Sequence, residues 1–183
     1  MHKSAMESFK LFNETYLSSL DKPHIVEIGS LAVNASIKKL INKDHKYTGV
    51  DITAGENVDV VLKDPYKFPI DDNSVDVVIS ISTFEHVDFF WLTFLEILRI
   101  LKKDGIFFLN VPSNGHIHRH DNDNWRFYPD SSLALEKWGL RNGRIDNNKK
   151  ILNFTKFPHD QDNWGWRFFY KIRKFLNKIN NKY

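Results

Sequence analysis

Short, continuously apolar runs recur between residues 24 and 111, and helical or turn-rich segments separate them. The runs predict strands over 24–28, 47–51, 58–62, 75–81 and 106–111. Because the apolar residues are continuous and not alternating, each strand is expected to be buried on both faces. Such strands, alternating with helices, are typical of a parallel sheet covered by helices on both sides. The pattern therefore predicts a doubly wound, mostly parallel, Rossmann-like α/β fold.

Apolar residues at helical spacing mark the segments expected to cover this sheet. They predict helices over 4–20, 89–101 and 131–140. A further helix, capped by Asn34 or Ser36 and ending at Ile41, is expected between the first two strands.

Composition limits the class of protein. The chain has 183 residues, of which 42% are hydrophobic, and this is enough for one domain with a buried core. Cysteine is absent, which excludes disulfides, thiolate metal sites and a cysteine nucleophile. No apolar run is long enough to span a membrane and no signal-peptide core is present, so we expect a cytoplasmic protein. A net charge of +3 does not favour nucleic acid as a partner.

The C-terminal segment is rich in cations and aromatic residues. We predict a basic amphipathic helix over 164–183, packed on its own protein or on a second subunit of a homodimer. Contact with an anionic membrane is the less favoured alternative. Within the single domain, 1–183, we assign an N-terminal helix (1–20), a cofactor-binding core (24–111), an acceptor-side loop and helix (112–160) and this C-terminal helix.

Three strand ends carry residues suited to an adenosine group. Glu27 and Gly29 lie where the first strand ends, and Asp51 ends the second strand, 22 residues after Gly29 (51 − 29 = 22). An acid about 20 residues after a glycine turn is placed to hold a ribose diol, and Asp64, after the third strand, can accept from an adenine amino group. The turn has a single glycine, which disfavours a pyrophosphate cofactor. S-adenosylmethionine is the cofactor that we expect, with its ammonium group near Glu27 or a nearby backbone carbonyl.

The chain resembles the class I S-adenosylmethionine-dependent methyltransferases. The similarity rests on HIVEIGS, YTGVDI, GENVDVVLKDPYKFPIDDNSVDVVISISTFEHV, ILRILKKDGIFFLNVPS and HRHDNDNWRFYPD, in this order. Among these enzymes, the chain is most similar to a branch of small methyltransferases that are often encoded among bacterial surface-polysaccharide genes. The resemblance implies an antiparallel C-terminal strand or hairpin. The expected cofactor-binding residues are Glu27, Gly29, Ser30, Asp51, Ile52, Asp64, Ser82 and Phe84.

Two segments supply residues for a methyl acceptor. His86 follows the fourth strand, and a polar, aromatic loop over 113–128 follows the fifth. Such loops on a rigid sheet often carry function. The candidate catalytic residues are His86, His118, His120 and Asp123, and the candidate substrate-binding residues are His116, Arg119, Trp125, Arg126 and Tyr128.

The alternating His116, His118 and His120 offer a metal site as an alternative, but an ordinary polar loop is favoured and we predict no metal. The predicted function is methyl transfer to a small molecule, an oxygen of an anionic sugar or nucleotide-linked precursor of surface polysaccharide. The competing hypothesis is a non-catalytic, degenerate methyltransferase fold that binds nucleotide or protein.

Overall fold

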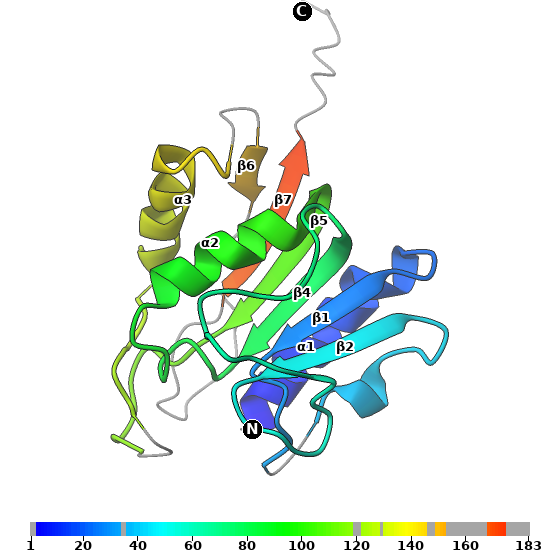
Figure 1. Cartoon of the computed structure of the whole chain (residues 1–183), viewed down its shortest axis with the longest axis horizontal. Coiled ribbons are helices and arrows are strands. Elements are labelled where there is room, and N and C mark those ends of the chain that lie inside the picture. Colours follow the sequence, from blue (N-terminus) through cyan, green and yellow to red (C-terminus); the bar gives the residue numbers. More distant parts are fainter. Residues whose placement is uncertain are drawn as a thin grey trace, which may run out of the picture.

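A computed structural model describes residues 3–33, 36–118, 122–128, 130–145, 149–152 and 168–174. Within them the chain forms a seven-stranded sheet in the order β3-β2-β1-β4-β5-β7-β6 (Figure 1). The strands are β1 (His24–Ile28), β2 (Lys46–Asp51), β3 (Val60–Val61), β4 (Val75–Ile81), β5 (Leu101–Asn110), β6 (Lys149–Leu152) and β7 (Phe168–Lys174).

The strands β3, β2, β1, β4 and β5 are all parallel, which confirms the predicted sheet. The chain runs outward from β1 through β2 to β3, and then returns to place β4 on the other side of β1. This reversal of strand order between β1 and β4 creates the position at which ligands bind in open α/β sheets.

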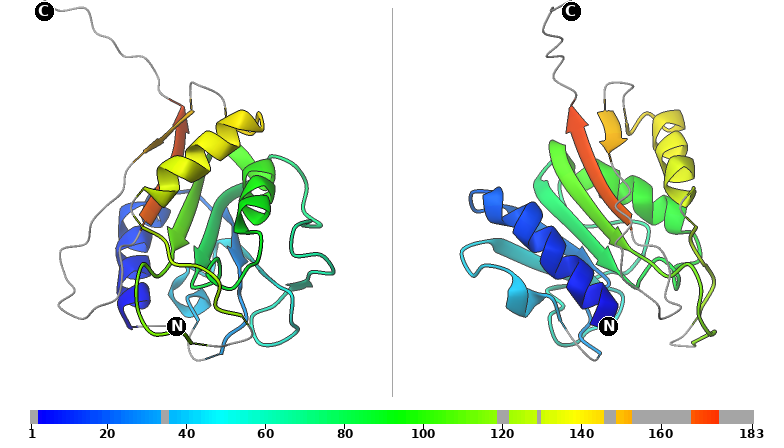
Figure 2. Two further views of the ribbon diagram at one scale, coloured as in Figure 1. Left: turned by 90° about the vertical axis from the view of Figure 1, so that its left-hand side faces the viewer. Right: turned by 180° about the vertical axis from the view of Figure 1, so that it is seen from behind.

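Helices cover both faces of the sheet, as predicted. Figure 2 shows α1 (Lys3–Thr15) on one face and α2 (Phe90–Ile100) with α3 (Ser131–Arg141) on the other. Phe9 and Phe12 of α1 are fully buried against Phe108 of β5. Phe94 of α2 packs on the opposite face, against Phe107. No described helix is long and apolar enough to cross a membrane.

The predicted helix from Asn34 or Ser36 to Ile41 was wrong in extent. The described part of this segment holds only a short 3₁₀ turn, η2 (Lys38–Leu40), while residues 34–35 lie outside the described residues. The Ser36 hydroxyl accepts the backbone N–H of Lys38 at 3.1 Å. Such a local turn competes with helix formation. A second 3₁₀ turn, η1 (Leu17–Ser19), replaces the end of the predicted helix over 4–20.

The C-terminal segment differs from the prediction of a helix over 164–183. Residues 168–174 form β7, which pairs antiparallel with β5 and with β6. Tyr170 and Ile172 alternate with Lys171 and Arg173 in the sequence, a spacing that suits a strand as well as a helix. Pairing with β5 favours the strand over the helix, because another strand satisfies the backbone groups at the edge of β5.

Candidate functional site

The turn after β1 is shaped by its contact with the turn after β4. Gly29 has a φ of +79°, a region that disfavours other residues. A Cβ added to Gly29 would lie 2.1 Å from the Thr83 hydroxyl, which donates hydrogen bonds to the carbonyls of Ile28 and Ile81. Gly29 is therefore required both by its backbone conformation and by the close approach of the two turns.

Glu27 places a buried carboxyl group within β1, two residues before this turn. The Tyr47 hydroxyl of β2 donates a hydrogen bond to it. The pKa of Glu27 is raised to about 7, mainly by burial. The hydrogen bond from Tyr47 lowers the pKa, and the negative charge of Asp51 raises it. Near neutral pH this carboxyl group is poised to become fully ionised when a cation binds beside it.

Asp51 lies at the carboxyl end of β2 and organises the adjacent loops. One of its carboxylate oxygens accepts the N–H of Leu31 at 3.1 Å, and the other accepts the N–H of Thr53 at 3.0 Å. Neighbouring Ser30 is buried, and its hydroxyl has no partner among the described residues. The spacing that predicted Asp51 opposite the Gly29 turn is thus realised in the structure.

The other predicted cofactor-binding residues have different surroundings. Ile52 is 58% exposed beside Asp51, and Asp64 is exposed with its carboxylate accepting the N–H of Tyr66. Ser82 has a φ of +50° and its N–H donates to the carbonyl of Asn110. Phe84 was also predicted to bind the cofactor, and its side chain is fully buried in the core. The left-handed turn at Ser82 redirects the chain, and Phe84 packs against Phe90, Phe107 and Phe127.

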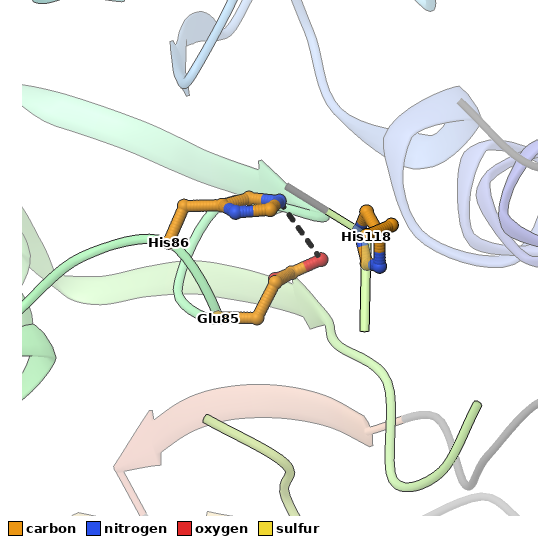
Figure 3. A group of neighbouring side chains, drawn as sticks. All are labelled: Glu85, His86 and His118. Atoms are coloured by element: carbon orange, nitrogen blue, oxygen red, sulfur yellow. Dashed lines mark ion pairs between the residues drawn. The ribbon is translucent and has the colours of Figure 1, made fainter. Parts of the chain in front are cut away.

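A second group of polar side chains lies after β4. Figure 3 shows Glu85, His86 and His118 converging, and they offer ligand atoms that all lie within 4.8 Å of one another. Glu85 is 1% exposed, and burial raises its pKa to about 8 while the charge of Arg126 opposes this rise. The rings of His86 and His118 meet edge to face with centroids 5.2 Å apart. The structure thus brings together two of the predicted histidines.

Asp123 and Arg126 form a tight ion pair. The guanidinium donates to both carboxylate oxygens at 2.6 Å, and these bonds hold the pKa of Asp123 well below its usual range. Asp123 also accepts the backbone N–H of His118, and its carboxylate lies 3.6 Å from the His118 ring Nδ1. The pair therefore positions His118, and Arg126 is already engaged within the protein.

The remaining acceptor-side candidates divide by exposure. Trp125 is half-buried against Phe90 and donates its ring N–H to the carbonyl of Val87. His116 and Tyr128 are exposed on the loop. Arg119 and His120 lie outside the described residues, so the predictions for them stay predictions.

Two members of these groups were not predicted. The sequence favours His86 and does not single out the adjacent Glu85, because nothing in the local sequence indicates that this carboxylate is buried. Tyr47 was assigned only to a strand. Its contact with Glu27 follows from the register of β1 and β2, in which Ile25 is opposite Tyr47.

A family model described as a methyltransferase domain matches residues 26–109, which span β1 to β5. No curated protein matches the sequence significantly.

Solved structures share the fold at low sequence identity. A 1,6-didemethyltoxoflavin N1-methyltransferase from Burkholderia thailandensis, crystallised with 1,6-didemethyltoxoflavin and S-adenosylhomocysteine, is 15% identical with a TM-score of 0.66, covering 93% of this chain and 79% of that one. The PH0226 protein from Pyrococcus horikoshii is 15% identical with a TM-score of 0.62, covering 93% and 91%. The [4+2]-cyclase SpnF is 14% identical with a TM-score of 0.57, covering 73% and 57%.

Proposed function

We propose that this chain, whose residues 26–109 match a methyltransferase-domain model, transfers a methyl group from S-adenosylmethionine to a small molecule. The observation that carries the proposal is the placement of Glu27, Gly29 and Asp51 at the carboxyl ends of β1 and β2, beside the reversal of strand order. When bound, the cofactor supplies a methyl group activated by a positively charged sulfur. The crystallised relative that holds S-adenosylhomocysteine supports this choice of cofactor.

The residues present fit this cofactor. Buried Glu27 offers a carboxyl group to the ammonium of the methionine part, because a nearby cation favours the ionised form. Gly29 has no side chain to obstruct the methionine part. The neighbouring Ser30 hydroxyl, which has no partner within the described part of the chain, can hydrogen-bond to that part of the cofactor. Asp51 accepts from the ribose diol, while exposed Ile52 and Asp64 provide an apolar surface and an acceptor for adenine.

For the acceptor, we propose a position over the loop at 113–128, on the side of β4 and β5. With Glu27, Asp51 and Asp64 proposed for the methionine and adenosine parts, the ends of β4 and β5 are the part of this sheet edge that would remain for an acceptor. His86 and His118 are the described histidines in reach of an acceptor hydroxyl there, and removal of its proton by a general base typically contributes roughly 10²–10⁴-fold to the rate. Exposed His116 and Tyr128 offer contacts to the rest of the acceptor.

For the acceptor's identity, we retain an oxygen of a sugar or nucleotide-linked, anionic precursor in surface-polysaccharide synthesis, a cytoplasmic reaction. Support comes from the similarity of the Pro-Ser and Trp-Arg-Phe-Tyr-Pro-Asp segments to that branch. Arg119 is the arginine proposed for the anionic group, since Arg126 is held by Asp123. A homodimer remains part of this proposal, without nucleic acid or membrane as a partner.

A non-catalytic binding module is the second candidate. It is favoured by the single glycine in the turn after β1 and by the fold shared with a [4+2]-cyclase, which illustrates that one fold serves several functions. The first candidate predicts that the cofactor binds and loses its methyl group, whereas the second predicts binding of a nucleotide or a partner protein with no loss of a methyl group.

The test measures binding and turnover separately. Calorimetry with S-adenosylmethionine is expected to give one site per chain. Incubation with methyl-labelled cofactor and a panel of nucleotide sugars and other small hydroxyl compounds is expected to yield S-adenosylhomocysteine and a labelled acceptor. Absence of cofactor binding contradicts the proposal, whereas binding with no turnover on any acceptor supports the non-catalytic module.

A further inference from the structure

We propose that Glu85, His86 and His118 form a binding site for one divalent transition-metal ion. The three side chains come from two segments: Glu85 and His86 follow β4, and His118 lies in the loop after β5 (Figure 3). Their ligand atoms lie within 4.8 Å of one another. This set differs from the alternating histidines of the loop, which the sequence alone suggested.

Glu85 provides an independent sign that the group is incomplete without a ligand. It is 1% exposed, and its Oε2 atom has no hydrogen-bond partner among the described residues. Its other oxygen lies 3.9 Å from Nε2 of His86, too far for a hydrogen bond. Buried polar atoms are rarely left unpaired in native proteins, and a bound cation satisfies such a carboxylate.

Both histidines are oriented as metal ligands usually are. Nδ1 of His86 donates to the carbonyl of Asn122, which leaves the lone pair of Nε2 facing Glu85. Nδ1 of His118 donates to the carbonyl of His116 at 3.4 Å, and it lies 3.6 Å from the carboxylate of Asp123. A backbone carbonyl or a carboxylate on the far ring nitrogen holds a ligating histidine in the required tautomer and raises its basicity.

The donor set determines the class of ion. Two imidazoles and one carboxylate suit Zn²⁺, Co²⁺, Ni²⁺ or Fe²⁺, whereas Mg²⁺ and Ca²⁺ prefer oxygen ligands. Ligand distances of about 2.0–2.2 Å in a tetrahedral site put the ligand atoms roughly 3.3–3.6 Å apart. The separations within the group, which are at most 4.8 Å, must therefore close by up to about 1.5 Å. His118 is the exposed member of the group, so a small movement of its ring would close the group without breaking the hydrogen bond from its backbone N–H to Asp123.

Three protein ligands leave at least one coordination position open, as in catalytic zinc sites. The open position is on the acceptor side, where an ion would lower the pKa of a bound hydroxyl. With the ion bound, His86 and His118 would be ligands and could not also act as the general base, so this role replaces that base and rests on the proposed function. Binding of the ion does not rest on it.

The experiment measures metal binding by the full-length, chelator-treated protein. Calorimetry with Zn²⁺ is expected to give one ion per chain, and Co²⁺ is expected to produce visible absorption bands from the bound ion. His118→Ala and Glu85→Gln are each expected to weaken Zn²⁺ binding at least about tenfold. The reason is that mutating even a residue that only orients a ligand typically lowers metal affinity about 10–100-fold.

His116→Ala is the matched control, since it removes an exposed histidine from the same loop but from outside the group. It is expected to leave Zn²⁺ affinity unchanged. No Zn²⁺ binding by the wild-type protein, or equal affinity for wild type and His118→Ala, overturns the proposal. So does an equal loss in His116→Ala and His118→Ala. His118→Ala changes an exposed side chain, and thermal unfolding of the metal-free variants verifies that they fold. If the protein binds metal but transfers no methyl group, the metal site is supported and only the proposed methyltransferase function is contradicted.

Discussion

Gly29 and Gly143 both have left-handed backbone conformations, with φ of +79° and +64°, but their surroundings differ. A Cβ on Gly29 would overlap the Thr83 hydroxyl, whereas a Cβ on Gly143 would meet nothing within 4 Å. Gly143→Ala is therefore expected to lower the free energy of unfolding by only about 1–2 kcal/mol, the cost of a left-handed backbone for a residue with a Cβ. Gly29→Ala is expected to cost a further ~1–3 kcal/mol from overpacking. Urea unfolding of both variants measures the difference, and equal losses would contradict the close approach of the two turns.

Asp51 is expected to control cofactor affinity. Charge-assisted bonds from a carboxylate to two ribose hydroxyls contribute on the order of 2–4 kcal/mol, so Asp51→Ala should weaken S-adenosylmethionine binding roughly 30- to 1,000-fold. Calorimetry measures the affinity. Asp44→Ala, which changes an exposed acid after η2, is the matched control and should bind normally. Unchanged affinity in Asp51→Ala would remove this residue from the site.

Glu27 is expected to make stability depend on pH. Its pKa is raised from 4.5 to about 7, so the folded state binds the extra proton between these values. Stability due to this group is therefore full below pH 4.5, falls as the pH rises and is lost above about 7. The groups acting on it are Tyr47, Asp51 and Lys38.

Glu27→Gln keeps the shape but does not titrate. Relative to this variant, the wild-type protein should lose on the order of 3 kcal/mol of unfolding free energy between pH 4.5 and pH 8. Urea unfolding at both pH values measures this loss. Glu7→Gln on the exposed face of α1 is the control, and its difference from wild type should stay constant with pH. A constant difference for Glu27→Gln as well would argue against a raised pKa.

At the scale of elements, β7 is expected to contribute to the sheet because it lies between β5 and β6. Ile172 pairs with Ile151, and a proline there removes a backbone N–H and strains the ladder. Ile172→Pro should lower the melting temperature by several degrees, whereas Ile172→Val, which favours strands, should change it little. The same melting temperature for wild type and Ile172→Pro would contradict the strand.

Strand positions could be predicted well where both faces are buried. The strands at 24–28 and 75–81 match the predicted bounds at both ends, since a continuous apolar run has one interpretation when turn residues flank it. The 168–174 segment could not be predicted, because its apolar residues suit both periods and its pairing with β5 joins residues far apart in the sequence.

The candidate site could be predicted only in part. Spacing along the chain indicated Gly29 and Asp51, because strand ends in a parallel sheet meet at one edge. Glu85 was not recognised, since its burial depends on distant residues: the backbone N–H groups of Asn124 and Trp125 donate to its carbonyl and close the loop over it. Burial of a charged side chain against sequence-distant backbone leaves no local pattern.

At the scale of the whole molecule, the reversal of strand order joins two groups of residues across one sheet. Glu27, Gly29 and Asp51 lie on the β1–β2 side, and Glu85 with His86 lies after β4. The contact between Gly29 and Thr83 connects the two turns. A cofactor held across this position contacts both halves of the sheet, so its binding energy is expected to stabilise the whole fold and not a single loop.

Thermal unfolding tests this coupling. A ligand at 100 times its dissociation constant that binds only the folded state adds about 2.7 kcal/mol, which for a chain of this size raises the melting temperature by about 5–10 °C. We expect S-adenosylmethionine to produce one cooperative transition, shifted upward as a whole. Asp51→Ala at the same ligand concentration should show little shift, because its affinity is weaker, while Asp44→Ala should shift like wild type. Two separate transitions, with only one responding to the cofactor, would contradict a site shared by both halves of the sheet.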